Sequence, residues 1–238
     1  MMDYFAGEVA ETYDSGGDDE FAPHVIARTA DTLRELAGDG PVLEFAIGTG
    51  RIAVPLHERG VEVYGIDLSP DMIAQLHAKT REIPAAVGDI ATTRVGSEFS
   101  LVYLVFNTIG NLTTQDAQIA CFANAARHLA PGGRFVIETL VPALQQLPLG
   151  ETDLVFHRSD TYLGVDEYDL VTQRLVSHHY DLARGTAVSV PFRYTWPAEL
   201  DLMARLAGLT PEHRWADWDR SPFTALSRAH VSVWRRQT

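Results

Sequence analysis

The chain has 238 residues, of which 46% are hydrophobic and 21% charged, a composition typical of a single globular domain. Its formal net charge of −13 argues against partners such as a nucleic-acid backbone or an anionic membrane surface. Cys121 is the lone cysteine, so it has no internal disulfide partner, and this favours a reducing, cytoplasmic location.

The first part of the chain, residues 1–37, is expected to form helices and a lid. Residues 7–13 predict a short helix, and the acidic, glycine-containing residues 14–20 predict a loop. Residues 23–36 repeat apolar side chains at helical spacing, so we expect an amphipathic helix there.

A strand, a glycine turn and a helix come next. Residues 42–47 are apolar except for Glu44, and they lead through Gly48-Thr49-Gly50 into a helical pattern over residues 51–59. Glycines allow a tight turn that brings backbone N–H groups close to a ligand, and the helix start supplies further donors. This stretch predicts the first half of a βαβ unit and a binding site at its turn.

Strands and helices continue to alternate up to residue 140. Residues 100–106 are apolar throughout, which is typical of a central parallel strand covered on both faces. Strands are predicted over residues 61–67, 84–89, 100–106 and 134–140, with helices after Ser69 and over residues 115–129, and a turn at Pro131-Gly132-Gly133. This alternation predicts an α/β fold with a doubly wound, mostly parallel sheet.

The pattern changes after the fifth strand. Residues 151–196 are expected to form an antiparallel β insertion of three or four strands, because residues 187–196 alternate and Arg184-Gly185 is a plausible hairpin turn after residues 173–182. A helix and two final strands are then predicted over residues 197–207, 211–218 and 230–235.

Several elements resemble the class I S-adenosylmethionine-dependent methyltransferases. They are the turn at residues 44–50, Asp67 ending the second strand, residues 88–90, and residues 129–133 before the fifth strand. The resemblance implies one domain, residues 1–238, with a seven-stranded Rossmann-like sheet. It implies S-adenosylmethionine as cofactor and S-adenosylhomocysteine as product. The insertion and the C-terminal part of the chain are similar to those of the natural-product and amino-sugar methyltransferases.

The resemblance also implies the residues that would contact the cofactor. Asp67 would accept hydrogen bonds from the ribose hydroxyls, with a helix-capping role as the alternative, and Asp89 would accept one from the adenine amino group. Glu44 would either hold the turn or meet the cofactor ammonium. Ala46 stands where glycine is usual. The full implied set is Tyr13, Glu44, Ala46, Gly48, Gly50, Arg51, Asp67, Leu68, Met72, Asp89, Ile90, Phe106 and Asn107.

The acceptor side carries weaker signals. The insertion would roof the site or form the contact of a homodimer. Histidine titrates in the range needed by a general base, so His178 and His179 are candidates, but neighbouring strand residues point to opposite faces and at most one would face the site. Candidate substrate residues are Glu138, Tyr180, Arg193 and Trp218, where Arg193 would bind an anionic group or pair with an acid across the hairpin. The sequence lacks the spacing of a metal site.

The leading hypothesis is methylation of a small-molecule acceptor, at nitrogen or oxygen, by in-line methyl transfer. A nicotinamide-dependent oxidoreductase is one alternative. It is disfavoured because Ala53 occupies the position of the third glycine and Lys79, the lone lysine, does not form a Tyr-x-x-x-Lys motif. A non-catalytic protein that only binds S-adenosylmethionine is the other alternative.

Overall fold

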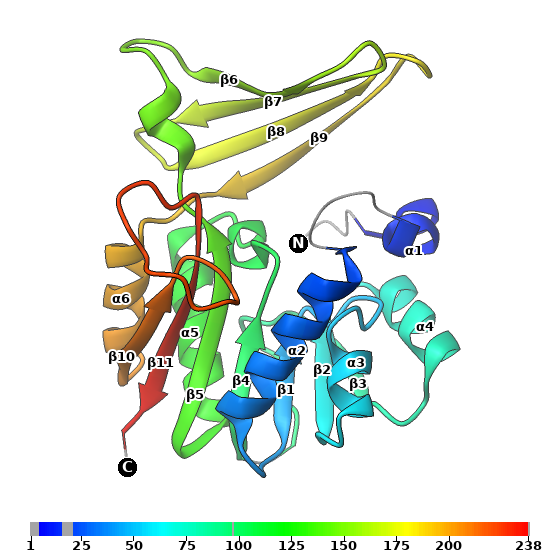
Figure 1. Cartoon of the computed structure of the whole chain (residues 1–238), viewed down its shortest axis with the longest axis vertical. Coiled ribbons are helices and arrows are strands. Elements are labelled where there is room, and N and C mark those ends of the chain that lie inside the picture. The colour runs from blue at the N-terminus through cyan, green and yellow to red at the C-terminus, as the bar shows by residue number, and fades with distance from the viewer. Residues whose placement is uncertain (1–4, 16–20, 97, 238) are drawn as a thin grey trace.

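A computed structural model describes residues 5–15, 21–96 and 98–237, and within them a seven-stranded sheet forms the centre of the fold (Figure 1). The strand order is β10-β11-β5-β4-β1-β2-β3, and β11 alone runs antiparallel to its two neighbours. The strands are β1 (Val42–Phe45), β2 (Val63–Asp67), β3 (Ala85–Val87), β4 (Phe99–Leu104), β5 (Leu129–Leu140), β10 (Leu209–Trp215) and β11 (Ala229–Arg236). The predicted doubly wound sheet is confirmed.

Helices cover both faces of this sheet. The longer ones are α2 (Pro23–Ala37), α3 (Ala53–Glu58), α4 (Pro70–Lys79), α5 (Gln115–His128) and α6 (Pro197–Leu206). Short helical pieces are α1 (Glu8–Thr12), η1 (Tyr13–Ser15), η3 (Thr108–Asn111) and η4 (Ala143–Gln146). Alternating residues of β5 separate two cores, since Phe135 and Ile137 pack with α5 and α6, whereas Val136 packs with α2 and α3.

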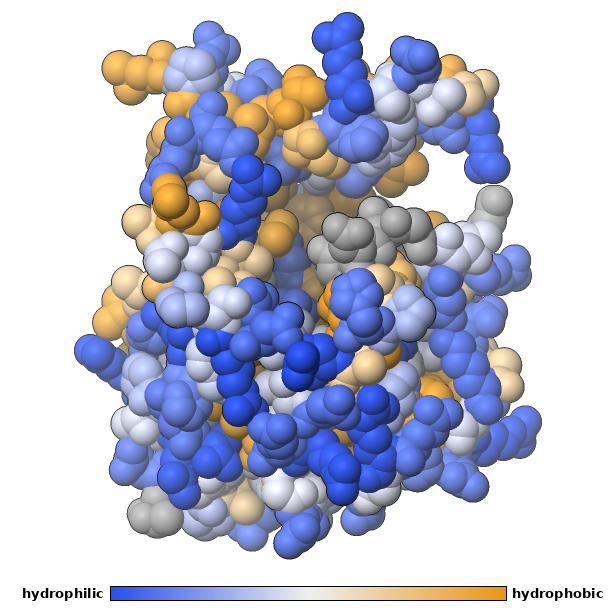
Figure 2. All heavy atoms as spheres, in the orientation of Figure 1, coloured by the Kyte–Doolittle hydropathy of each residue, from blue (hydrophilic) through white to orange (hydrophobic). Residues whose placement is uncertain are grey.

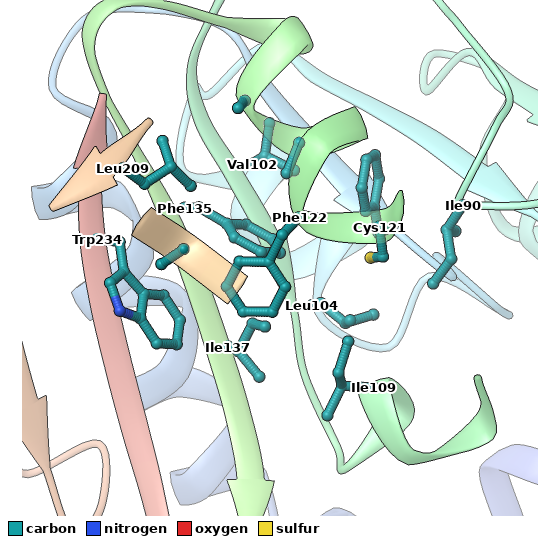
Figure 3. Packing of buried hydrophobic residues seen from close by; sticks show 14 of the residues in the cluster. Ile90, Val102, Leu104, Ile109, Cys121, Phe122, Phe135, Ile137, Leu209 and Trp234 are labelled. Carbon is teal, nitrogen blue, oxygen red and sulfur yellow. The ribbon is translucent and has the colours of Figure 1, made fainter. Parts of the chain in front are cut away.

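Aromatic side chains fill the core between the sheet and α5 (Figure 3). The Phe122 ring lies 5.1 Å from Phe135 and 5.3 Å from Trp234 between centroids, in edge-to-face contacts. All three side chains are fully buried, and each such burial stabilises the fold by about 1.5–3 kcal/mol. Cys121 is buried beside them, and this burial raises the pKa of its thiol.

The predicted insertion is a separate four-stranded antiparallel sheet, ordered β6-β7-β8-β9. Its strands are β6 (Asp153–Arg158), β7 (Tyr162–Asp169), β8 (Arg174–Asp181) and β9 (Thr186–Arg193). The hairpin between β8 and β9 closes at the pair Asp181↔Thr186, and Gly185 in its turn has φ +66°. Figure 1 shows this sheet above the carboxyl ends of the parallel strands.

Two local predictions were wrong. Pro131-Gly132-Gly133 lies inside β5 rather than before it, because parallel pairing already begins at Phe99↔Leu129 and the extra residues form a bulge before Leu101↔Arg134. The alternating stretch ends as a strand at Arg193, because the chain then turns into α6, which starts at Pro197. Residues 16–20 of the predicted acidic loop lie outside the described residues.

Candidate functional site

A cavity of about 240 Å³ lies at the carboxyl ends of β1 and β2, where ligands bind in sheets of this kind. Its walls come from the N-terminal segment, the turns after β1 to β4, and β9. The lining residues are Phe5, Tyr13, Ala46, Gly48, Asp67, Leu68, Met72, Gly88, Asp89, Ile90, Thr108, Asn111, Leu112, Thr113 and Pro191. The structure thus brings together most of the cofactor residues that the sequence suggested. Glu44, Gly50, Arg51, Phe106 and Asn107 do not line this cavity.

The carboxylate of Asp67 accepts hydrogen bonds from two turns at the cavity wall. Its Oδ2 accepts the Gly48 N–H at 2.7 Å and its Oδ1 accepts the Ser69 N–H at 2.8 Å. The cap of α4 is Ser69, whose hydroxyl accepts the Met72 N–H, so Asp67 is not the capping side chain. Each carboxylate oxygen can accept more than one hydrogen bond, so these two backbone contacts are compatible with a further contact to a ligand.

Asp89 and its neighbours form the next part of the wall. Asp89 Oδ1 accepts the Ala91 N–H at 2.8 Å, which fixes the turn after β3. Ile90, Leu68 and Met72 add apolar surface to the same cavity. A carboxylate beside a flat apolar surface suits a planar base that carries an amino group.

Ala46 adopts a left-handed backbone conformation, with φ +54°, before Gly48 at φ +56°. Glycine adopts this conformation without steric cost. This explains why glycine is usual here in the methyltransferase family that the sequence resembles. Gly50 has a different role, because a Cβ there would lie 2.4 Å from Leu76 Cδ1. Glycine at this position therefore permits close packing of α4.

Replacing Ala46 with glycine is expected to raise the free energy of unfolding by about 0.5 kcal/mol. The left-handed conformation costs an L-residue about 1–2 kcal/mol. This exceeds the roughly 0.5–1 kcal/mol of stability that a protein usually loses when glycine replaces alanine, because glycine has more conformational entropy in the unfolded chain. Urea denaturation measures the difference. The control is Ala74→Gly on the exposed side of α4, which should lower stability. Equal losses in both variants would show that Ala46 is not strained.

Glu44 lies under the glycine turn rather than in the cavity. Its side chain is buried, and Tyr103 Oη donates a hydrogen bond to its Oε2 at 2.8 Å. Burial raises the pKa of Glu44 to about 8, although hydrogen bonds from Tyr103 and the Ala53 backbone and the charge of Arg51 act in the opposite direction. These contacts favour the interpretation that Glu44 holds the turn.

An aromatic cluster links the N-terminal segment to the end of β4. The Arg51 guanidinium carbon lies 4.9 Å from the centroid of Phe106 and 5.2 Å from that of Phe21. Phe21 in turn packs edge-on against Tyr13 at 5.6 Å. Burial raises the pKa of Tyr13 to about 12, so its hydroxyl stays protonated near neutral pH.

Polar contacts hold the N-terminal segment across the cavity. Asp14 accepts a hydrogen bond from the Thr49 hydroxyl at 2.6 Å and pairs with Lys79 at 2.5 Å. The Gly7 N–H donates to Asp71 at 2.8 Å. Since Thr49 belongs to the glycine turn, these bonds support the predicted lid role of the segment.

Three of the predicted substrate residues, Arg193, Glu138 and Trp218, make contacts within the protein. Arg193 is 6% exposed and binds Gln118 at 2.5 Å and Glu199 at 2.7 Å. Arg193 does pair with an acid, but this acid is Glu199 on α6 and not one across the hairpin, and its contact with an anionic substrate group stays a prediction. The Glu138 carboxylate accepts the Trp218 indole N–H at 2.7 Å.

The two candidate bases lie within β8 and do not line the cavity. His178 contacts Ser189 at 2.8 Å and stacks on Tyr180, whereas His179 contacts Tyr162 and Ser177 on the opposite face. The expected split between faces is therefore confirmed. Their catalytic role and the substrate role of Tyr180 stay predictions.

The cavity is also lined by residues outside the predicted cofactor set, of which Gly88 belongs to the predicted motif at residues 88–90: Phe5, Gly88, Thr108, Asn111, Leu112, Thr113 and Pro191. The polar loop after the fourth strand was the available signal for Thr108 and Asn111. Over residues 5–15, 21–96 and 98–237, no group of three or more His, Cys, Asp or Glu side chains could hold a metal ion. In the same part of the chain, no helix has the length and apolar character needed to cross a membrane.

Comparisons with known proteins agree with this geometry. A family model described as a methyltransferase domain matches residues 42–133. The cypemycin N-terminal methyltransferase of Streptomyces sp is 32% identical over 208 residues, which cover 82% of this chain and 83% of that protein.

Two solved structures extend the similarity. The CcbJ methyltransferase of Streptomyces caelestis is 37% identical with a TM-score of 0.84, covering 97% of this chain and 96% of the other. CalS10, an amino pentose methyltransferase of Micromonospora echinaspora solved with S-adenosylmethionine, has a TM-score of 0.69 at 22% identity, covering 100% and 99%. The chain belongs to the class I S-adenosylmethionine-dependent methyltransferases, and S-adenosylmethionine is its cofactor.

Proposed function

We propose that the protein methylates an amine nitrogen of a small-molecule acceptor. The observation that carries this proposal is the 32% identity to an N-terminal methyltransferase, because it extends over 82% of the chain, well beyond the matched domain at residues 42–133. CalS10, which shares the fold, is described as an amino pentose methyltransferase. A neutral amine is already a nucleophile, whereas a hydroxyl acceptor needs a base.

The chemistry of the cavity fits the cofactor. Asp67 would accept the ribose hydroxyls, and Asp89 with the Ile90 amide would bind the adenine edge, while Leu68 and Met72 would pack on its faces. The bound cofactor supplies an electrophilic methyl group on a sulfonium. The chain's own residues bind and orient the two reactants and exclude water, which supplies much of the acceleration in such a displacement.

The insertion would roof the acceptor site. Figure 2 shows a recess between its sheet and the rest of the molecule, and Pro191 of β9 already lines the cavity. The exposed apolar side chains of Val155, Phe156 and Val188 on the same sheet support its second predicted role, the contact of a homodimer. A cytoplasmic location stays part of this proposal.

The proposal predicts methylation of amines but not of matched alcohols. The purified protein is incubated with S-adenosylmethionine and pairs of acceptors, an amino sugar or a peptide with a free N-terminus against its hydroxyl analogue. Mass spectrometry should show the gain of a methyl group in at least one amine, together with S-adenosylhomocysteine. Methylation of the hydroxyl analogues would contradict the nitrogen assignment. Tight cofactor binding without any turnover would favour the non-catalytic alternative.

A further inference from the structure

The corner that follows β4 has an unfavourable backbone conformation. Phe106 has φ +59° and Asn107 has φ +56°, so two consecutive residues with side chains occupy the left-handed region. Such a conformation is unfavourable for a residue with a side chain and persists only where its surroundings hold it. The corner leads directly into η3, and Thr108 and Asn111 of η3 line the cofactor cavity.

The end of β5 holds this corner through several hydrogen bonds. The Phe106 N–H donates to Glu138 Oε2 at 3.0 Å, and the Asn107 N–H donates to the Glu138 carbonyl at 3.2 Å. Asn107 Oδ1 accepts the Thr139 hydroxyl at 2.7 Å and the Leu140 N–H at 3.2 Å. The side chain of Glu138 therefore reaches the first strained residue directly.

The second oxygen of Glu138 is bound from the opposite side. Trp218 donates its indole N–H to Oε1 at 2.7 Å, and this tryptophan is only 5% exposed. The Trp218 carbonyl accepts the Thr32 hydroxyl of α2 at 3.3 Å. A carboxylate accepts on both oxygens, so it can bridge two N–H donors, which an amide cannot do with its NH₂ end.

We propose that Glu138 is a positioning residue, which together with Trp218 holds the Phe106–Asn107 corner in the conformation that forms the cofactor cavity. This role differs from the substrate contact that the sequence suggested for both side chains. The corner acts on the cavity by two routes. One is η3, which continues from Asn107, and the other is the Phe106 ring, which packs 5.8 Å from Phe21 and through it against Tyr13.

A rescue experiment tests this bridge. Calorimetry measures the affinity for S-adenosylhomocysteine in the wild type, Glu138→Gln, Trp218→Phe and the double variant. Glu138→Gln should weaken binding about tenfold or more, because the glutamine NH₂ must face one of two buried N–H donors. Trp218→Phe removes one of the two donors and should weaken binding of S-adenosylhomocysteine less, by about threefold at most. In the double variant the amide oxygen can face Phe106, so the affinity should return to that of Trp218→Phe.

Two outcomes would overturn the proposal. The first is a Glu138→Gln variant that binds as the wild type does, and the second is a double variant in which the two losses multiply. Glu212→Gln is the matched control. Glu212 lies in β10 and pairs with Arg134 instead of the corner after β4, so this variant should leave the affinity for S-adenosylhomocysteine unchanged. If Glu138→Gln unfolds, the same rescue must appear in the melting temperature of the double variant, and failure to recover would equally refute the bridge.

Discussion

Replacing Arg193 with methionine is expected to lower the free energy of unfolding by about 3 kcal/mol, the lower end of the usual cost of removing one partner from a buried ion pair, because Arg193 is buried and Glu199 only partly so. Arg193 lies where β9 meets α5 and α6, and it donates to Gln118, Gln173 and Glu199. Burial alone would raise the pKa of Glu199, but hydrogen bonds from Gln173, Arg193 and Gln115 lower it overall. Without Arg193 this partly buried carboxylate loses its cationic partner and keeps only the hydrogen bonds from Gln173 and Gln115.

Urea denaturation of Arg193→Met measures this loss. Arg184→Met is the control, because Arg184 forms an exposed pair with Asp181 and should matter little. Adding Glu199→Leu to Arg193→Met should recover much of the stability, since it removes the unpaired charge. An Arg193→Met variant as stable as the wild type would show that this network does not anchor the insertion to α5 and α6.

Replacing Asp67 with alanine is expected to weaken S-adenosylmethionine binding by roughly 1.5–3 kcal/mol, the range for hydrogen bonds to a charged group. The variant loses the proposed ribose contacts and also the two backbone bonds to Gly48 and Ser69. Calorimetric titration measures the change. Asp116→Asn in the exposed first turn of α5 controls for the loss of one negative charge. Unchanged affinity in Asp67→Ala would exclude the assigned role.

Local signals in the sequence were enough to predict most of the central fold. The glycine turn before α3, the Ser69 cap of α4 and the Arg184-Gly185 hairpin each depend on chemistry within a few residues, so they can be recognised without tertiary information. The bulge in β5 shows the limit. Pro131-Gly132-Gly133 has strong turn composition, yet pairing of Leu129 with Phe99 extends the strand through it.

The candidate site was predictable where it follows the ends of parallel strands. Asp67 ends β2, and Gly48 and Asp89 lie in the turns after β1 and β3, so topology alone brings them together. The partners of Arg193 and Glu138 were not predictable, because Gln118 and Trp218 lie 75 and 80 residues away in the chain. Only the packing of α5 and the C-terminal loop brings them into contact.

The central claim is that the cavity beside Asp67 and Asp89 binds S-adenosylmethionine. The most direct measurement is a calorimetric titration of the wild-type protein with S-adenosylhomocysteine, compared with a nicotinamide dinucleotide under the same conditions. We expect saturable one-to-one binding of S-adenosylhomocysteine and no measurable binding of the dinucleotide. Tighter binding of the dinucleotide would contradict it.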